Sequence, residues 1–327
     1  MPDGAVTGTI AVRGGAIVVR EIGFDAARAL TGGGTGRVAA VFARAIYLRT
    51  PRGWACAGPP GLGGGPLNLL CDLPDAMDWA ARGLRPGAAI SIGEKAIDLG
   101  RGLVLALDGA RVWQPAPSGP WSQESLGKGL RALDRLTAGA LPTAGLATFL
   151  RPDAVAASAE ARKAAPNVAI LYAWLRGTPE SNASPSHSVL EAATRLLGLG
   201  PGLTPSGDDF LVGMLVVLSL AGRFDLVAAV DQVIRPTLEE GTGPISRLHL
   251  AAALDGESSE RLHVMVNAVL AGDHDVLASR LVLISQVGHC SGWDTLAGAV
   301  MVLRVLARTA SLGDGGRARC RLRISTM

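Results

Sequence analysis

The sequence predicts an α+β protein, with a β-rich N-terminal part followed by an α-helical C-terminal part. Up to residue 113, short apolar runs are broken by glycine and proline, which is typical of strands joined by tight turns. Residues 114–120 are too rich in proline to continue a strand or a helix. Beyond them, Ala- and Leu-rich segments tolerate helical periodicity. This segregation of the two kinds of element defines the class.

The N-terminal apolar runs give the expected strands. Residues 38–48 and 75–84 are ambiguous between strand and helix. Strands are expected at 9–12, 16–19, 38–48, 67–70, 89–92, 96–99 and 103–107.

The C-terminal pattern gives the expected helices and the domain boundaries. We expect a β-rich domain over 1–113, a helical domain over 121–312 that carries the glycine-rich motifs, and a mobile basic tail over 313–327. No repeat of solenoid period is visible. Helices are expected at 126–136, 152–164, 188–197, 210–220, 225–234, 245–254, 259–270, 275–286 and 296–306.

The composition points to a protein that works with partner chains. Apolar residues make up 48% of the 327 residues and charged residues only 18%, and the mean hydropathy is +0.31. Contiguous apolar surface usually marks an interface, so partner subunits are expected to cover it. The longest apolar run, 210–221, is shorter than the roughly 20 residues that a membrane helix needs. We therefore expect a core helix there and no membrane partner.

Charge, cysteine spacing and the first residues exclude further classes of protein. A net charge of +3 is too small to indicate a nucleic-acid partner. The first residues lack a secretory signal, and the four cysteines, Cys56, Cys71, Cys290 and Cys320, show neither zinc-site spacing nor a disulfide framework. These features predict a cytoplasmic protein with reduced thiols and without a metal or another cofactor.

The most informative stretch is Gly-Leu-Gly-Pro-Gly-Leu-Thr-Pro-Ser-Gly-Asp-Asp-Phe-Leu-Val-Gly, residues 198–213. Its glycines permit positive φ and allow a ligand to approach the main chain. Thr204 or Ser206 stands where a helix N-cap belongs, and Asp208 and Asp209 follow in the first turn. The pattern predicts a ligand-facing turn before a buried helix, where N–H groups favour an anion. A structural helix start remains the alternative.

A second cluster, Gly-His-Cys-Ser-Gly-Trp-Asp at 288–294, also precedes an apolar helix. The two clusters indicate a symmetric pair of helix starts whose ends meet in one pocket. For His289, a partly buried structural histidine is as good an interpretation as a catalytic one. The predicted pocket is built from His289, Ser291, Asp294, Asp208 and Asp209.

Together these two motifs resemble the AllH-type family, which supplies one subunit of oxamate carbamoyltransferase. Residues 241–247, 251–256 and 63–68 resemble other segments of that family, so the resemblance runs from about residue 36 to 306. It implies companion carbamoyltransferase subunits, a small anionic substrate, and a context in allantoin and purine nitrogen metabolism. The sequence departs from the family pattern at Ala39-Ala40, where a His-Ser pair is usual, and at Tyr47, where Asn is usual. If the polar residues at these positions contact the substrate in relatives, the departures favour a different acceptor.

Carbamoyl transfer needs donors for the tetrahedral oxyanion and a seat for the departing phosphate. Arg247, beside Ser246, is the predicted anion clamp, because a guanidinium binds phosphate or carboxylate bidentately. We predict His289, Asp209 and Asp208 as catalytic residues, with His289 as the general base. The predicted substrate-binding residues are Gly202, Thr204, Ser206, Gly207, Ser246, Arg247, Ser291 and Asp294.

Two other functions fit the same residues. One is a non-catalytic scaffold subunit whose glycine motifs form an interface, which the low charge and high apolar content support. The other is a magnesium-dependent hydrolase that uses Asp208, Asp209 and Asp294 as ligands. Adjacent aspartates at a helix start do not both point readily at one ion, so this alternative ranks third.

Overall fold

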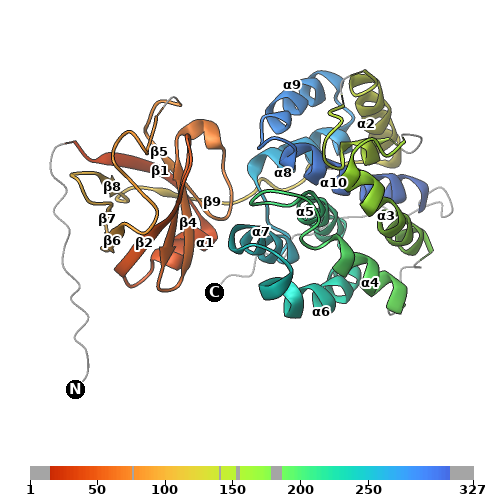
Figure 1. The fold of residues 1–327 in the computed structure, drawn as a ribbon. Helices are drawn as coiled ribbons and strands as arrows, with labels where there is room; N and C mark the ends of the chain where they lie inside the picture. The colour runs from red at the N-terminus through yellow and green to blue at the C-terminus, as the bar shows by residue number, and fades with distance from the viewer. Residues whose placement is uncertain (1–14, 76, 140, 152–154, 178–185, 310–327) are drawn as a thin grey trace. The chain divides into compact units, whose positions relative to one another are not determined.

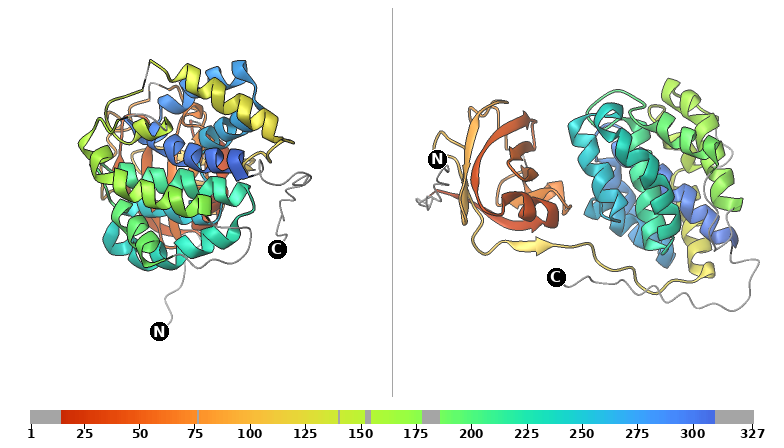
Figure 2. Two further views of the ribbon diagram at one scale, coloured as in Figure 1. Left: turned by 90° about the vertical axis from the view of Figure 1, so that its right-hand side faces the viewer. Right: turned by 90° about the horizontal axis from the view of Figure 1, so that it is seen from below.

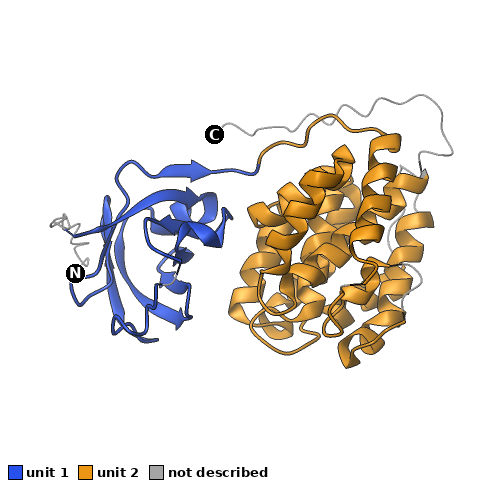
Figure 3. Ribbon diagram, turned by 90° about the horizontal axis from the view of Figure 1, so that it is seen from above, with its two compact units in different colours: residues 1–115 blue, residues 116–327 orange. Residues whose placement is uncertain are grey.

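The computed structural model describes residues 15–75, 77–139, 141–151, 155–177 and 186–309. The chain divides into two compact units, residues 1–115 (unit 1) and residues 116–327 (unit 2), coloured separately in Figure 3. Unit 1 is built mainly of strands and unit 2 of helices. The predicted α+β class is therefore confirmed. The predicted basic tail at 313–327 lies outside the described residues.

Unit 1 is one mixed sheet that closes on itself. The strands run in the order β5-β4-β3-β2-β6-β7-β8-β1-β9, and β5 also pairs with β1. The helix α1 (Phe24–Leu30) packs against β4 and β1, and the interior holds Ile46, Leu48, Leu69 and Trp79. The strands are β1 Ile17–Gly23, β2 Gly34–Val41, β3 Ile46–Thr50, β4 Gly53–Gly58, β5 Asn68–Cys71, β6 Ala89–Ile92, β7 Ala96–Asp98, β8 Val104–Ala106 and β9 Arg111–Trp113, with the short 3-10 helix η1 at Pro60–Leu62.

Several strand expectations need correction. The run 38–48 is the end of β2, a turn and the start of β3, while 75–84 forms turns where it is described. The strand β4, Gly-Trp-Ala-Cys-Ala-Gly, was missed because its small residues are buried without alternation. The expected strand at 9–12 lies outside the described residues.

The glycine segment 63–68 has a structural role inside unit 1. The Asn68 side-chain amide donates to the carbonyl of Gly63 at 2.9 Å, and the Ala26 N–H donates to the carbonyl of Pro66 at 3.0 Å. A Cβ on Gly64 would lie 2.2 Å from the indole nitrogen of Trp113. The segment therefore joins β5 to the start of α1.

The two departures from the family pattern meet on the sheet. Ala40 pairs with Tyr47 across β2 and β3. The same row continues through Cys56 on β4 to Asn68 on β5. A different side chain at position 40 would therefore lie opposite residue 47, and a different side chain at position 47 would lie opposite residue 40.

Unit 2 is a helical bundle around α5, which is apolar and buried on nearly all sides (Figure 1, Figure 2). Its helices agree with those expected from periodicity apart from their exact ends, except at 152–164, where α3 begins only at residue 159 and continues to 177, and residues 155–158 are not helical. No described helix is long and apolar enough to span a membrane. The helices are α2 Gln123–Leu136, η2 Ala147–Leu150 (3-10), α3 Ala159–Gly177, α4 His187–Leu196, α5 Ser206–Leu220, α6 Phe224–Gly241, α7 Pro244–Leu254, α8 Glu260–Ala271, α9 His274–Ser285 and α10 Ser291–Thr309.

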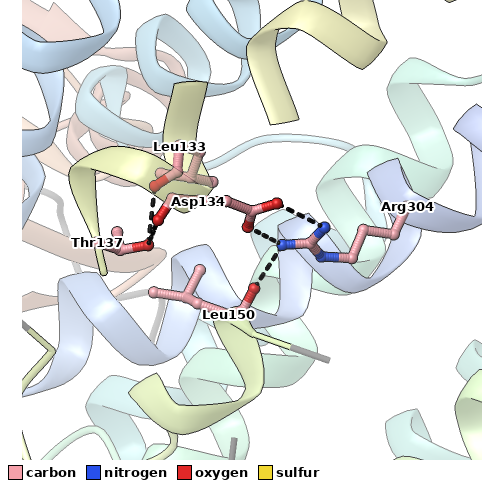
Figure 4. A network of polar contacts seen from close by, with 5 residues as sticks. All are labelled: Leu133, Asp134, Thr137, Leu150 and Arg304. Carbon is pink, nitrogen blue, oxygen red and sulfur yellow. Dashed lines mark hydrogen bonds and ion pairs between the residues drawn. The ribbon is translucent and has the colours of Figure 1, made fainter. Parts of the chain in front are cut away.

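An ion pair fixes the C-terminal half of α10 inside the bundle. The Arg304 guanidinium pairs with Asp134 of α2 and donates to the carbonyl of Leu150 at 2.8 Å (Figure 4). Only 14% of the Arg304 side chain is exposed. Because charge-assisted hydrogen bonds strengthen away from water, this contact holds α10 in register with α2 and η2.

Candidate functional site

The site is organised by the crossing of α5 and α10, the two helices that the motifs begin. A Cβ on Gly213 would lie 1.8 Å from the carbonyl oxygen of Thr295. A Cβ on Gly298 would lie 1.8 Å from the carbonyl oxygen of Phe210. The helices thus touch backbone to backbone, which only residues without a side chain permit at this separation.

The crossing is symmetric because the sequence repeats. Residues 206–213 read Ser-Gly-Asp-Asp-Phe-Leu-Val-Gly, and residues 291–298 read Ser-Gly-Trp-Asp-Thr-Leu-Ala-Gly. The shared pattern Ser-Gly-x-Asp-x-Leu-x-Gly places equivalent residues on both helices, and the contacts of Gly213 and Gly298 are equivalent as well. The two helix starts are therefore related by an approximate twofold axis, as the expected symmetric pair requires.

Gly207 and Gly292 serve packing and not ligand approach. A Cβ on Gly207 would lie 2.0 Å from the carbonyl oxygen of Leu196, and one on Gly292 would lie 1.9 Å from that of Ile284. Their N–H groups donate to the carbonyls of Leu199 and Val287. The expectation that these N–H groups are open to an anion is wrong, because the preceding turns already satisfy them.

The turn before α5 has the predicted backbone but not the predicted cap. Gly198, Gly200 and Gly202 all have positive φ, and Gly202 is exposed with open space around it. Pro205 occupies the N-cap position and no side chain caps the helix, so neither Thr204 nor Ser206 is the cap. The Thr204 hydroxyl instead forms a 2.8 Å hydrogen bond with that of Ser291. This bond brings the two motifs together.

Asp208 links the start of α5 to the start of α7. One carboxylate oxygen accepts the Gly198 N–H at 2.7 Å, and the other accepts the hydroxyls of Ser246, at 2.6 Å, and of Thr242. Burial raises the pKa of Asp208, and the three donors oppose the rise. With its oxygens used inside the chain, Asp208 braces two helix starts.

Asp209 and Asp294 occupy equivalent positions of the repeat and are both buried, with exposed fractions of 7% and 1%. Asp294 Oδ1 accepts the Leu146 N–H at 2.6 Å. The Oδ2 atoms of both residues are buried without a hydrogen-bond partner in the described chain.

Both acids have raised pKa values. Burial raises the pKa of Asp294 to about 6, and burial raises that of Asp209 well above its ordinary value. The hydroxyls of Ser291 and Thr204 oppose the shift at Asp209, while the charge of Asp294 adds to it. The Ser206 hydroxyl and the Leu146 N–H oppose the shift of the pKa at Asp294. Each helix therefore supplies a serine near the acid of the other.

The remaining predicted residues lie at the edge of this cluster or point elsewhere. His289 is exposed in the turn before α10, beside the motif but not buried within it. Ser246 faces Asp208, whereas the Arg247 guanidinium contacts Glu239 of α6, at 3.5 Å from its carbonyl oxygen and 3.8 Å from its carboxylate. The structure thus separates the predicted Ser246–Arg247 pair, with only Ser246 held at the cluster.

The acids do not form a metal cage. Among the described residues, no group of three or more His, Cys, Asp or Glu side chains is placed to hold a metal ion. The oxygens of Asp208 are taken by Gly198, Thr242 and Ser246. The arrangement gives no support to the magnesium-dependent alternative.

These features define an α+β protein of two units, whose helical unit carries a buried polar site at a quasi-symmetric helix crossing. A family model described as oxamate carbamoyltransferase subunit AllH matches residues 196–303. This segment contains both motifs and the linking residues Thr242 and Ser246, and over these residues the match confirms the resemblance to the AllH-type family. No solved structure matches the chain.

Proposed function

We propose that the chain is a subunit of a carbamoyltransferase that acts with companion chains on carbamoyl phosphate and a small amide or amine such as oxamate. The observation that carries this proposal is the buried acid pair Asp209–Asp294, which lies at the helix crossing inside the segment similar to the AllH family. Buried carboxyl groups with raised pKa values are typical of acid–base chemistry.

The pair suits the proton transfer that the reaction requires. The acceptor nitrogen forms a bond to the carbamoyl carbon, the carbon–oxygen bond to phosphate breaks, and phosphate leaves with the electron pair. The proton lost by the nitrogen passes to a carboxylate of the pair, which acts as general base. Asp208 and Ser246 position the helix starts, and His289 remains a candidate base at the exposed edge of the site.

The groups that bind the departing phosphate must lie elsewhere than at the start of α5. The N–H groups of Gly207, Asp208 and Asp209 in the first turn of α5 are already paired within the chain, and carboxylates repel a bare anion. We propose that a companion subunit supplies the cationic groups that hold the phosphate. Subunit AllH is by its name one part of an oxamate carbamoyltransferase, which supports this division of labour.

The test is reconstitution. The chain is purified together with the products of its genomic neighbours, and phosphate release from carbamoyl phosphate is measured against a panel of small amides and amines. We expect release that depends on both the chain and the acceptor, and a loss of at least a hundredfold with Asp209→Asn. A folded Asp209→Asn complex of near-normal activity would contradict the assignment of the base, and no release with all companions present would contradict the transferase.

A scaffold subunit without its own chemistry is the second candidate, because the glycines of the two motifs have a packing explanation within the chain itself. Backbone carbonyls lie against each of Gly207, Gly213, Gly292 and Gly298. A scaffold would assemble with the same companions but tolerate Asp209→Asn in the assay. The same experiment therefore separates the two candidates.

A further inference from the structure

Asp209 and Asp294 each carry a carboxyl oxygen whose partner is missing from the described chain. Both Oδ2 atoms are buried, and neither is bonded to the other or to any described donor. Buried polar atoms are almost always hydrogen-bonded, because an unsatisfied one destabilises the folded state through its desolvation. Asp208, one residue away, shows the usual situation with three donors. The two open oxygens therefore point to a partner from outside the chain.

The two carboxyl groups lie in the same region of the bundle. They come from equivalent positions in the first turns of α5 and α10, and the charge of Asp294 acts on Asp209. The Thr204–Ser291 hydrogen bond joins the two helix starts beside them. A single group that satisfies both oxygens must offer two hydrogens.

We infer that the carboxyl groups of Asp209 and Asp294 together bind a nitrogen that carries at least two hydrogens, as in an ammonium ion or a primary amide. Such a nitrogen donates to both oxygens at once, and an ammonium ion also balances buried negative charge. A bare anion would be repelled, and the described acids do not form a cage for a metal ion. The assignment of this nitrogen to the carbamoyl acceptor rests on the proposed function, whereas its binding does not.

Thr204 connects this seat to the surface. It is half-buried and follows Gly202 and Leu203, which are both exposed, and its hydroxyl lies close enough to Asp209 to affect its pKa. A ligand that enters here breaks one hydroxyl–hydroxyl hydrogen bond, between Thr204 and Ser291, and can replace it with its own.

The test compares donors with their N-methylated analogues on the full chain. Thermal unfolding and calorimetric titration are measured with ammonium chloride against tetramethylammonium chloride, and with acetamide against N,N-dimethylacetamide, at constant ionic strength. Ligands that bind only the native state raise the unfolding temperature, and the rise grows with the ratio of ligand concentration to dissociation constant. We expect the two N–H donors to raise it and the two methylated compounds to have no effect.

Variants locate the effect. Asp209→Asn and Asp294→Asn should each weaken ammonium binding at least tenfold, while Asp231→Asn, which removes an acid paired with Arg235 on the surface of α6, should leave binding unchanged. Equal stabilisation by tetramethylammonium, or full binding in both folded variants, would overturn the inference. If a variant fails to fold, the comparison of donors with methylated analogues on the unaltered chain still shows whether the chain binds a nitrogen that carries hydrogens.

The outcome is separable from the proposed function. Donor binding by the chain without phosphate release from the reconstituted complex would retain the nitrogen seat and reject the transferase. Phosphate release from the complex, together with equal binding of the N–H donors and their methylated analogues, would retain the transferase and reject the nitrogen seat.

Discussion

At the residue scale, the three aspartates at the starts of α5 and α10 have two different roles. Asp208 is saturated by donors and braces the starts of α5 and α7. Asp209 and Asp294 are buried with an open oxygen each. Burial without full pairing disfavours the charged form, so these two acids make the protein sensitive to pH.

The first prediction concerns Asp294 and the pH dependence of stability. Because its pKa rises from 3.8 to about 6 on folding, the native state holds the proton more tightly than the unfolded chain. The resulting stability is present below about pH 4 and is lost as the pH rises through about 6, on the order of 3 kcal/mol. Asp209 shifts in the same direction.

Urea unfolding followed by the helical circular dichroism signal between pH 4 and pH 8 measures this loss. Asp294→Asn should flatten the decline, because the amide cannot titrate, while Asp231→Asn should keep it. An unchanged slope in the Asp294 variant would count against the burial-induced shift.

The second prediction concerns Asp208. Asp208→Ala leaves the Gly198 N–H and the hydroxyls of Thr242 and Ser246 without their acceptor. We expect a loss of about 2–4 kcal/mol, against about 1 kcal/mol for Ser246→Ala, which removes one bond. Thermal unfolding compares the two. Equal costs would mean that Asp208 does not brace the helix starts.

At the element scale, the crossing of α5 and α10 determines where the acids lie. The backbones touch at Gly213 and Gly298, so the first turns of the two helices, and with them Asp209 and Asp294, are brought together. The turns 197–205 and 286–290 then satisfy the N–H groups of Gly207 and Gly292. The site is thus a product of helix packing.

The third prediction tests this crossing. Gly213→Ala places a methyl group against the Thr295 carbonyl and should cost roughly 1–3 kcal/mol or more. Gly127→Ala is the matched control in α2, where the Cβ meets only the flexible end of Arg131 at 3.2 Å, and it should stabilise by about 0.5–1 kcal/mol.

The double variant Gly213→Ala/Gly298→Ala adds a further check. Once one methyl group has forced the helices apart, the second costs less, so the double variant should lose less stability than the sum of the single ones. Strict additivity, measured by chemical denaturation, would show that the two contacts are independent.

The elements themselves were predictable where periodicity is strong, and their contacts were not. The helices of unit 2 follow from their Ala- and Leu-rich patterns, and the meeting of the two motifs follows from their likeness. The sequence does not reveal what a glycine faces: it predicts Gly207 as a substrate-binding residue, whereas Gly207 faces the carbonyl of Leu196. The repeat at 206–213 and 291–298 was a visible signal for pairing Asp209 with Asp294.

At the scale of the whole molecule, each unit has a hydrophobic core of its own. The core of unit 1 holds Leu48, Leu69 and Trp79, and that of unit 2 holds Phe210, Leu215 and Val300. The site residues discussed above all belong to unit 2, whereas the departures Ala40 and Tyr47 belong to unit 1.

The fourth prediction is that residues 116–327 fold alone. This segment has enough residues to bury a core that is stable on its own. The isolated segment should therefore keep the helical content of the full chain and the same hydrogen-exchange protection of α5 and α10. Exchange of the α5 amides at the rate of an unfolded peptide would show that unit 2 depends on unit 1.

The repeat has one consequence for recognition. Two equivalent helix starts offer a ligand on their shared axis two orientations that differ by a half-turn, and identical surroundings would make both equally populated. The repeat is broken at its third position, where Asp208 on α5 corresponds to Trp293 on α10. An acid on one side and an indole on the other remove the degeneracy. The third position of the repeat is therefore where the twofold symmetry of the crossing is broken most strongly in chemistry.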